Sequence, residues 1–280
     1  MPKLRVPFNR PELAGREMEY MRDAVQRSHL SGDGWYTQRC HELLREILGV
    51  EHVLLTTSCT HALELTALLL DIGPGDEVIL PSFTFVSSAN AFVLRGARPV
   101  FADIRPDTFN LDENDVERKI TSRTRAIVVV HYSGIACAMD ALQLIAQRSG
   151  AAIVEDAAHA LFGTYRGRPL GTFGTLASLS FHETKNVTCG EGGALVINDP
   201  ALFDRAEILR EKGTNRSRFF RGEVDKYSWV DVGSSYLPSD LLAAFLFAQL
   251  ERHEESQNRR RVIWETYATE LADWAAARGV

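Results

Sequence analysis

Short apolar segments alternate with helical segments over residues 52–157, and this alternation constrains the fold more than any other feature of the chain. Helical patterns at 60–72, 87–96 and 139–149 separate the apolar segments. Segments that are apolar on both faces are typical of buried parallel strands. The alternation predicts an α/β fold, a mostly parallel sheet with helices on both of its faces. The expected strands lie at 52–57, 77–81, 98–103, 125–132 and 151–157.

The pattern changes after residue 157. Segments 175–182 and 192–199 are strand-like and are joined by a polar turn that contains several glycines. Residues 213–236 form a long irregular stretch, and loops of that length inside a domain are often functional. Residues 239–276 predict a long helix with a break at its charged centre and an apolar stripe on its last part.

Composition argues against several classes of protein. The chain has 31 basic and 37 acidic side chains, and the net charge of −6 disfavours binding to nucleic acid. No stretch approaches the roughly 18 uncharged apolar residues of a membrane helix, and no secretory signal is expected. The four cysteines show no CxxC pair, which predicts a cytoplasmic protein without a metal site.

The strongest local signal for chemistry is Lys185, in the segment SFHETKN (180–186). It follows an expected buried strand and lies in the polar turn. At the edge of a low-dielectric pocket the pKa of a lysine is lowered, so that its amine can form a Schiff base with an aldehyde cofactor. The alternative is a solvated surface lysine, as most lysines are.

Three further strand ends fit the same kind of ligand. At the end of 151–157, Asp156 either pairs with a protonated pyridine nitrogen or caps the next helix, and His159 can reach the ring's phenolic oxygen. In TTSCTHAL (56–63) a strand enters a helix whose first N–H groups either bind phosphate or are simply capped. Phe85 either stacks on a planar ring or belongs to the core. Their order along the chain describes a pyridoxal phosphate site.

These motifs resemble those of the DegT/StrS-type sugar-nucleotide aminotransferases, which are fold-type I pyridoxal phosphate enzymes. The resemblance is most specific in SGDGWYTQRC (31–40), in residues 54–97 and in residues 210–236. It implies the cofactor-binding large domain of such an enzyme over residues 1–240. It also implies that residues 241–280 are the helical start of a C-terminal small domain that is largely missing.

The resemblance also implies a role for each matching residue. Lys185 would hold the cofactor and act as the catalytic residue, with Asp156 on the pyridine nitrogen and His159 on the phenolic oxygen. Phe85 would stack on the ring, and a hydroxyl group together with a helix N-terminus would hold the phosphate. The expected cofactor-binding residues are Cys59, Thr60, Phe85, Asp156, His159, Ser180, Lys185 and Ser235.

Ser235 departs from the family pattern. Many members have an asparagine in a GxNxR motif that reaches the phosphate from the partner subunit, and here residues 233–237 read GSSYL. The resemblance implies a homodimer with the active site at the interface, crossed by the loop 212–236. Four cations of this loop are either ligands of a nucleotide diphosphate or solvated: Lys212, Arg216, Arg218 and Arg221.

The implied reaction is a two-stage transamination. L-Glutamate gives its amino group to the cofactor, which then aminates the 4-keto carbon of dTDP-4-dehydro-6-deoxy-D-glucose. Some relatives are dehydratases with a histidine in place of the lysine, and Lys185 argues against that activity. The other alternative is a truncated homologue that binds the cofactor but has an interaction or regulatory role. This alternative is suggested by the apolar stripe of Trp264, Tyr267, Leu271 and Trp274, which the short C-terminal region leaves uncovered.

Overall fold

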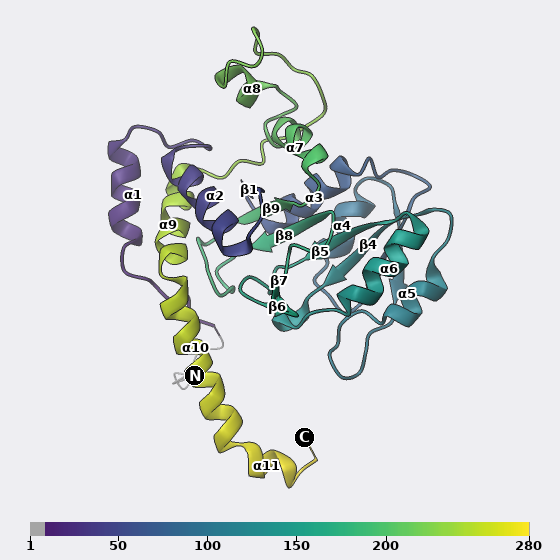
Figure 1. Cartoon of the computed structure of the whole chain (residues 1–280). Helices are drawn as coiled ribbons and strands as arrows, with labels where there is room; N and C mark the ends of the chain where they lie inside the picture. Colours follow the sequence, from purple (N-terminus) through teal and green to yellow (C-terminus); the bar gives the residue numbers. More distant parts are fainter. Residues whose placement is uncertain (1–8, 280) are drawn as a thin grey trace, which may run out of the picture.

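Seven strands form one sheet in the computed structural model, which describes residues 9–279 (Figure 1). Among these seven, β9 alone runs antiparallel to both of its neighbours, β1 and β8, while the remaining pairs are parallel. The predicted mostly parallel sheet is confirmed. From edge to edge its strands are β1 (His52–Thr56), β9 (Gly193–Ile197), β8 (Leu176–Ser180), β5 (Ala152–Asp156), β4 (Thr124–Val130), β2 (Glu77–Pro81) and β3 (Arg98–Ala102).

Helices cover both faces of the sheet, as expected for strands that are apolar on both sides. One face packs against α3 (Cys59–Leu69), α4 (Ser87–Val93) and α7 (Phe203–Arg210). On the other face, α5 (Glu113–Lys119) and α6 (Met139–Ser149) cover the β2–β5 half. The β1–β9 half of that face packs against α1 (Glu17–Gln26), α2 (Trp35–Leu48) and α9 (Asp240–Glu251).

Side chains alternate between the two faces with the period of two that a strand imposes. In β4, Ala126 and Val128 pack toward α3 and α4, whereas Ile127 and Val129 pack toward α5 and α6. In β5, Val154 points toward the α3 and α4 face. The strand that ends in Glu155 and Asp156 therefore sends its two carboxylates to opposite sides of the sheet.

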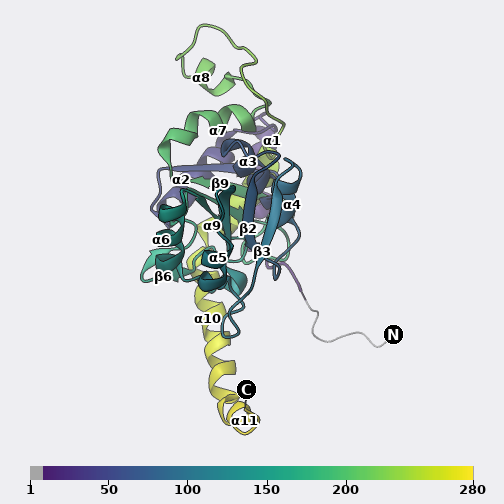
Figure 2. The ribbon, with the colours of Figure 1, turned by 90° about the vertical axis from the view of Figure 1, so that its right-hand side faces the viewer.

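The C-terminal region begins as part of this core and then leaves it. Helix α9 buries an apolar face against α1 and α2. The helical conformation is interrupted at Arg252, where φ is −110° and ψ is 18°. Helix α10 (His253–Glu270) and the short α11 (Ala272–Ala276) then project away from the sheet (Figures 1 and 2). The predicted break and the exposure of the apolar stripe are both observed. The division of the chain at residue 240 stays a prediction.

The other elements are short. Strands β6 (Thr164–Tyr165) and β7 (Arg168–Pro169) form a hairpin, and two 3-10 turns, η1 and η2, cover Tyr132–Gly134 and Pro200–Leu202. Residues 213–236 are irregular as predicted, apart from α8 (Arg216–Phe220). Within residues 9–279, no helix combines the length and the apolar character that crossing a bilayer requires.

Candidate active site

A cleft of about 370 Å³ opens at the carboxyl ends of β4, β5 and β8, beside the first turns of α3 and α4. Open α/β sheets bind ligands at this edge, where strand ends and helix N-termini converge. The structure brings seven of the eight expected cofactor-binding residues into the lining of this one cleft. They are Cys59, Thr60, Phe85, Asp156, His159, Ser180 and Lys185.

Asp156 is the carboxylate that faces the cleft. It is buried at the end of β5, where Oδ2 accepts a 2.6 Å hydrogen bond from the hydroxyl of Ser88 on α4. Its Oδ1 accepts the backbone N–H of Ala158 at 3.1 Å. The side chain caps the turn that follows the strand, but no described helix begins there, so the alternative of a helix cap is wrong. These two neutral donors hold the carboxylate at the wall of the cleft.

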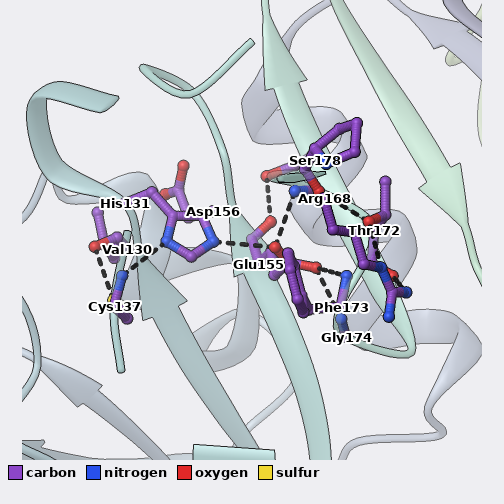
Figure 3. A network of polar contacts seen from close by, with 12 residues as sticks. Val130, His131, Cys137, Glu155, Asp156, Arg168, Thr172, Phe173, Gly174 and Ser178 are labelled. Atoms are coloured by element: carbon purple, nitrogen blue, oxygen red, sulfur yellow. Dashed lines mark hydrogen bonds and ion pairs between the residues drawn. The ribbon is translucent and has the colours of Figure 1, made fainter. Parts of the chain in front are cut away.

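Glu155 points to the other side of the sheet, into a fully buried network (Figure 3). Its Oε2 lies 2.9 Å from Nε2 of His131, and Nδ1 of that ring accepts the backbone N–H of Cys137 at 3.2 Å. The network therefore assigns the ring proton to Nε2, which donates it to Glu155. The Glu155 carboxylate also accepts the backbone N–H groups of Gly171, Phe173 and Gly174. Glu155 thus anchors the 168–174 loop and the end of β4 beneath the cleft.

Lys185 is half-buried in the turn after β8. Burial lowers the pKa of its amine, although the neighbouring Cys59 and Asp156 act in the opposite direction. A lowered pKa leaves more of the amine neutral and nucleophilic. The alternative of a fully solvated lysine is therefore not what the structure shows.

His159 lies on the same wall of the cleft. Burial lowers the pKa of its ring, and the charge of Lys185 lowers it further. Its Nδ1 is placed to accept the backbone N–H of Ser133 at 3.3 Å. That contact leaves the proton of the neutral ring on Nε2, so that His159 presents a donor. A neutral donor suits the phenolic oxygen of a cofactor ring.

The first turn of α3 forms the other end of the cleft. Ser58 is the N-cap, and its hydroxyl accepts the N–H of His61 at 3.1 Å. Ser58 therefore caps the helix, so the simple capping given as the alternative to phosphate binding is present. In the part of the chain that the structure describes, the N–H groups of Cys59 and Thr60 have no protein acceptor. They remain available to an anion, together with the hydroxyl of Thr60, which lies 2.8 Å from that of Ser87.

Phe85 stands at the rim of the cleft and is 73% exposed. The alternative that it is an ordinary core residue is therefore wrong. A large apolar ring this exposed beside a cleft is positioned for a ligand or for a second chain.

Ser235 does not line the cleft of its own chain. It is exposed and forms an isolated bridge with Glu211, and the next residue, Tyr236, accepts the N–H of Thr57 at the carboxyl end of β1. Three of the four loop cations are already engaged, in ion pairs of Arg216 with Glu211, Arg218 with Glu223 and Arg221 with Glu207. Their role toward a diphosphate stays a prediction, and so does the contact of Ser235 with a partner's cofactor.

A larger cavity of about 530 Å³ lies between α2, β1, α7 and α8. None of the expected cofactor-binding residues lines it, although two of the loop cations, Arg216 and Arg221, do. Its main charged groups neutralise one another, as in the pairs Arg210–Asp33 and Arg221–Glu207. Volume alone therefore does not identify the reactive site, and the smaller cleft has the better-matched chemistry.

Sequence reasoning missed Ser88, although a signal was present. Ser88 follows Phe85 by three positions at the start of α4, so the segment that places Phe85 at the rim of the cleft also brings Ser88 to Asp156. It also missed Tyr132, which lines the cleft from the 3-10 turn after β4. That turn contains Ser133 at a φ of +54°, a conformation that sequence patterns do not predict.

Comparison with known proteins decides the family. Residues 11–279 match the DegT/DnrJ/EryC1/StrS aminotransferase family. The chain belongs to this family. The pyridoxal phosphate cofactor and the fold-type I fold are thereby confirmed, and the chain is an aminotransferase of a family whose solved structures include a putative sugar aminotransferase.

Solved structures of family members superpose on most of the chain. The putative sugar aminotransferase Spr1654 from Streptococcus pneumoniae, in its PMP form, is 30% identical with a TM-score of 0.88, covering 95% of this chain and 72% of its own. The aminotransferase TlmJ from Streptoalloteichus hindustanus is 35% identical with a TM-score of 0.88, covering 95% and 71%. DesI, solved in the presence of its TDP-sugar product, is 35% identical with a TM-score of 0.83, covering 95% and 64%.

The cleft of this DegT-family aminotransferase fits the cofactor chemically. Two free N–H groups at the N-terminus of α3 suit a phosphate, and a buried carboxylate at the end of β5 suits a pyridinium nitrogen. Lys185 supplies the amine that an aldehyde requires. The three kinds of group line a single cleft large enough for a small planar ligand.

Proposed function

We propose that this protein is a dTDP-4-amino-4,6-dideoxygalactose transaminase. It transfers the amino group of L-glutamate to the 4-keto carbon of dTDP-4-dehydro-6-deoxy-D-glucose and yields dTDP-4-amino-4,6-dideoxy-D-galactose. This sugar would serve the synthesis of the enterobacterial common antigen in the cytoplasm. The observation that carries the proposal is that Lys185 and Asp156 line one cleft in a chain of the DegT family.

Different residues of the cleft would bind different parts of the cofactor. The first turn of α3, at Cys59 and Thr60, and the hydroxyl of Ser180 would hold the phosphate. Asp156 would pair with the pyridine nitrogen, and His159 would donate to the phenolic oxygen. When bound, pyridoxal phosphate supplies an electron sink that stabilises negative charge on the substrate carbon.

Lys185 performs the proton transfer. Burial lowers the pKa of its amine, so more of the free amine is neutral and able to accept a proton. In the first stage it removes the proton from Cα of glutamate, and in the second it returns a proton to C4 of the sugar. Its place in the cleft, beside Asp156 and Cys59, keeps the amine within the reaction site rather than in bulk water.

A sugar nucleotide as substrate is supported by the comparison with DesI, whose structure was determined with a TDP-sugar product. A second copy of the chain would complete the site. Exposed apolar side chains on and beside α4, namely Phe85, Val86, Val93 and Leu94, form a surface that a homodimer would bury. The loop 212–236, which carries exposed Phe220 and Trp229, would cross this interface.

The test is amination in vitro. Purified protein with pyridoxal phosphate and L-glutamate is incubated with dTDP-4-dehydro-6-deoxy-D-glucose, and the product is identified by mass spectrometry and by NMR at C4. We expect a 4-amino sugar of galacto configuration. The gluco epimer or a different preferred keto sugar would contradict the proposed specificity. Cofactor capture without amination of any keto sugar would favour the non-catalytic alternative.

A further inference from the structure

Phe109 is strained and exposed at the same time. It lies in the loop between β3 and α5 with a φ of +58°, a region that bulky side chains rarely occupy. Its ring is 53% exposed, so burial of the side chain offsets little of the strain. Strained residues of this kind persist where the surrounding structure holds them, and they are concentrated at ligand sites.

The loop around Phe109 is held in place by a buried residue. The side chain of Asn110 donates from Nδ2 to the carbonyl of Ile135 at 2.8 Å and accepts the N–H of Tyr132 at 3.0 Å. Arg105 closes the same loop, because its carbonyl accepts the N–H of Phe109 at 2.9 Å. These bonds fix Phe109 against the turn that carries Tyr132.

Phe109 is the outer end of a row of rings that starts in the cleft. His159 and Tyr132, which both line the cleft, lie edge to face with centroids 5.4 Å apart. Tyr132 lies 4.5 Å from Phe83, and Phe83 lies 5.6 Å from Phe109. Phe83 and Phe109 are both exposed and stand outside the lining of the cleft. The row therefore leads from the reaction site to the surface.

We propose that Phe83 and Phe109 form a stacking site for the nucleobase of a nucleotide sugar whose hexose reaches Lys185. This inference rests on the proposed function and assigns the base-binding end of that site. Exposed aromatic faces bind planar bases through stacking. The nearby Arg105 is engaged with Asp107 and Glu113, both at 3.0 Å, so this end of the row suits a neutral base better than a diphosphate.

The test measures binding of thymidine diphosphate and of inorganic pyrophosphate to the pyridoxal phosphate holoenzyme by calorimetry. The variants are Phe83→Ala and Phe109→Gly, and the matched control is Phe101→Ala, a ring on β3 that is 50% exposed and outside the row. We expect each row variant to lose about tenfold in affinity for thymidine diphosphate and none for pyrophosphate. We expect the control to match the wild type.

Phe109→Gly also separates a ligand role from a structural one. Glycine accepts a positive φ without strain, so the melting temperature is expected to stay the same or to rise while nucleotide affinity falls. Unchanged affinity for thymidine diphosphate, or equal losses for both probes, would overturn the proposal. A shift of the sedimentation coefficient in the row variants alone would overturn it in favour of a protein interface. Conversion of the cofactor by glutamate in the wild type tests the proposed function separately.

Discussion

The hydroxyl of Ser88 lies 2.6 Å from Oδ2 of Asp156 and joins the first turn of α4 to the end of β5. Both side chains are buried, and Thr84 lies 2.7 Å from the same hydroxyl. The bond fixes the orientation of the carboxylate across the cleft. It also ties the position of Asp156 to the helix that begins next to Phe85, so one hydrogen bond aligns the two residues that we propose to contact the cofactor ring.

Replacing Ser88 by alanine should therefore weaken cofactor binding. A hydrogen bond to a charged group contributes about 1.5–3 kcal/mol, so the dissociation constant of pyridoxal phosphate is expected to rise about tenfold or more. Fluorescence titration of the apoenzyme with pyridoxal phosphate measures the change. Ser88→Thr keeps the hydroxyl and should stay within a few-fold of the wild type. Equal affinities of the alanine variant and the wild type would show that Ser88 does not position Asp156.

Gly193 supports the phosphate end of the site through its lack of a side chain. A Cβ at this position, the first of β9, would overlap the backbone of Ser58 and Cys59 at the start of α3. Gly193→Ala should displace that helix start and cost about 1–3 kcal/mol of unfolding free energy, as overpacking usually does. Gly73→Ala is the control, because a Cβ there meets no atom within 4 Å. Thermal denaturation measures the stability of both variants. Equal melting temperatures would contradict the close approach of Gly193 to the backbone of Ser58 and Cys59.

His41 should make the fold sensitive to acid. Burial, followed by the charge of Arg210, lowers the pKa of this ring to about 3, and its Nε2 accepts the N–H of Leu55 at 2.9 Å. The unfolded chain binds a proton near the ordinary pKa of about 6.5. Between these two values the unfolded state binds more protons than the folded state. Stability is therefore complete above pH 6.5 and falls as the pH decreases toward 3.

The slope attributable to His41 is at most about 1.4 kcal/mol per pH unit. His41→Gln retains an acceptor for Leu55 and cannot titrate, so its unfolding free energy should decrease less steeply between pH 6.5 and 4. Urea denaturation at several pH values compares the two proteins. Parallel curves for variant and wild type would assign the acid sensitivity to other groups.

The exposed side chains of α4 should govern the oligomeric state. Leu94 is 63% exposed at the end of this helix, and Leu144, on α6 of the opposite face, is 58% exposed. Leu94→Asp places a charge in the proposed interface and should shift the protein toward monomer in sedimentation velocity. Leu144→Asp should leave the sedimentation unchanged. The reverse pattern would place the interface on the other face of the sheet.

Much of the fold was predictable because strand periodicity and burial act locally. The segments 77–81 and 139–149 were predicted with the bounds that the structure shows for β2 and α6. The helices α1 and α2 were not predicted. Their apolar residues pack against α9, which lies more than 190 positions later in the sequence. Which faces of α1 and α2 are buried therefore depends on this long-range contact.

The site was predictable where a chemically distinctive residue ends a strand, as with Lys185 and Asp156. The supporting contacts of small polar side chains were not predictable, because nothing in the sequence around Ser88 indicates that the fold brings it to Asp156, 68 positions away. The row from His159 to Phe109 also depends on a backbone conformation that its sequence does not signal. Ser235 lies outside the cleft of its own chain, and its contact with a partner's cofactor stays a prediction.

The central feature of the proposed site is Lys185, the residue that we propose to bind the cofactor covalently. The chain has five lysines: Lys3, Lys119, Lys185, Lys212 and Lys226. The direct measurement is to reconstitute the protein with pyridoxal phosphate, reduce it with borohydride and locate the phosphopyridoxyl group by peptide mass spectrometry. We predict that the label lies on Lys185 and that Lys185→Ala loses it together with the visible absorption of the bound cofactor. A label on any other lysine, or an unaltered spectrum in the variant, would contradict the account.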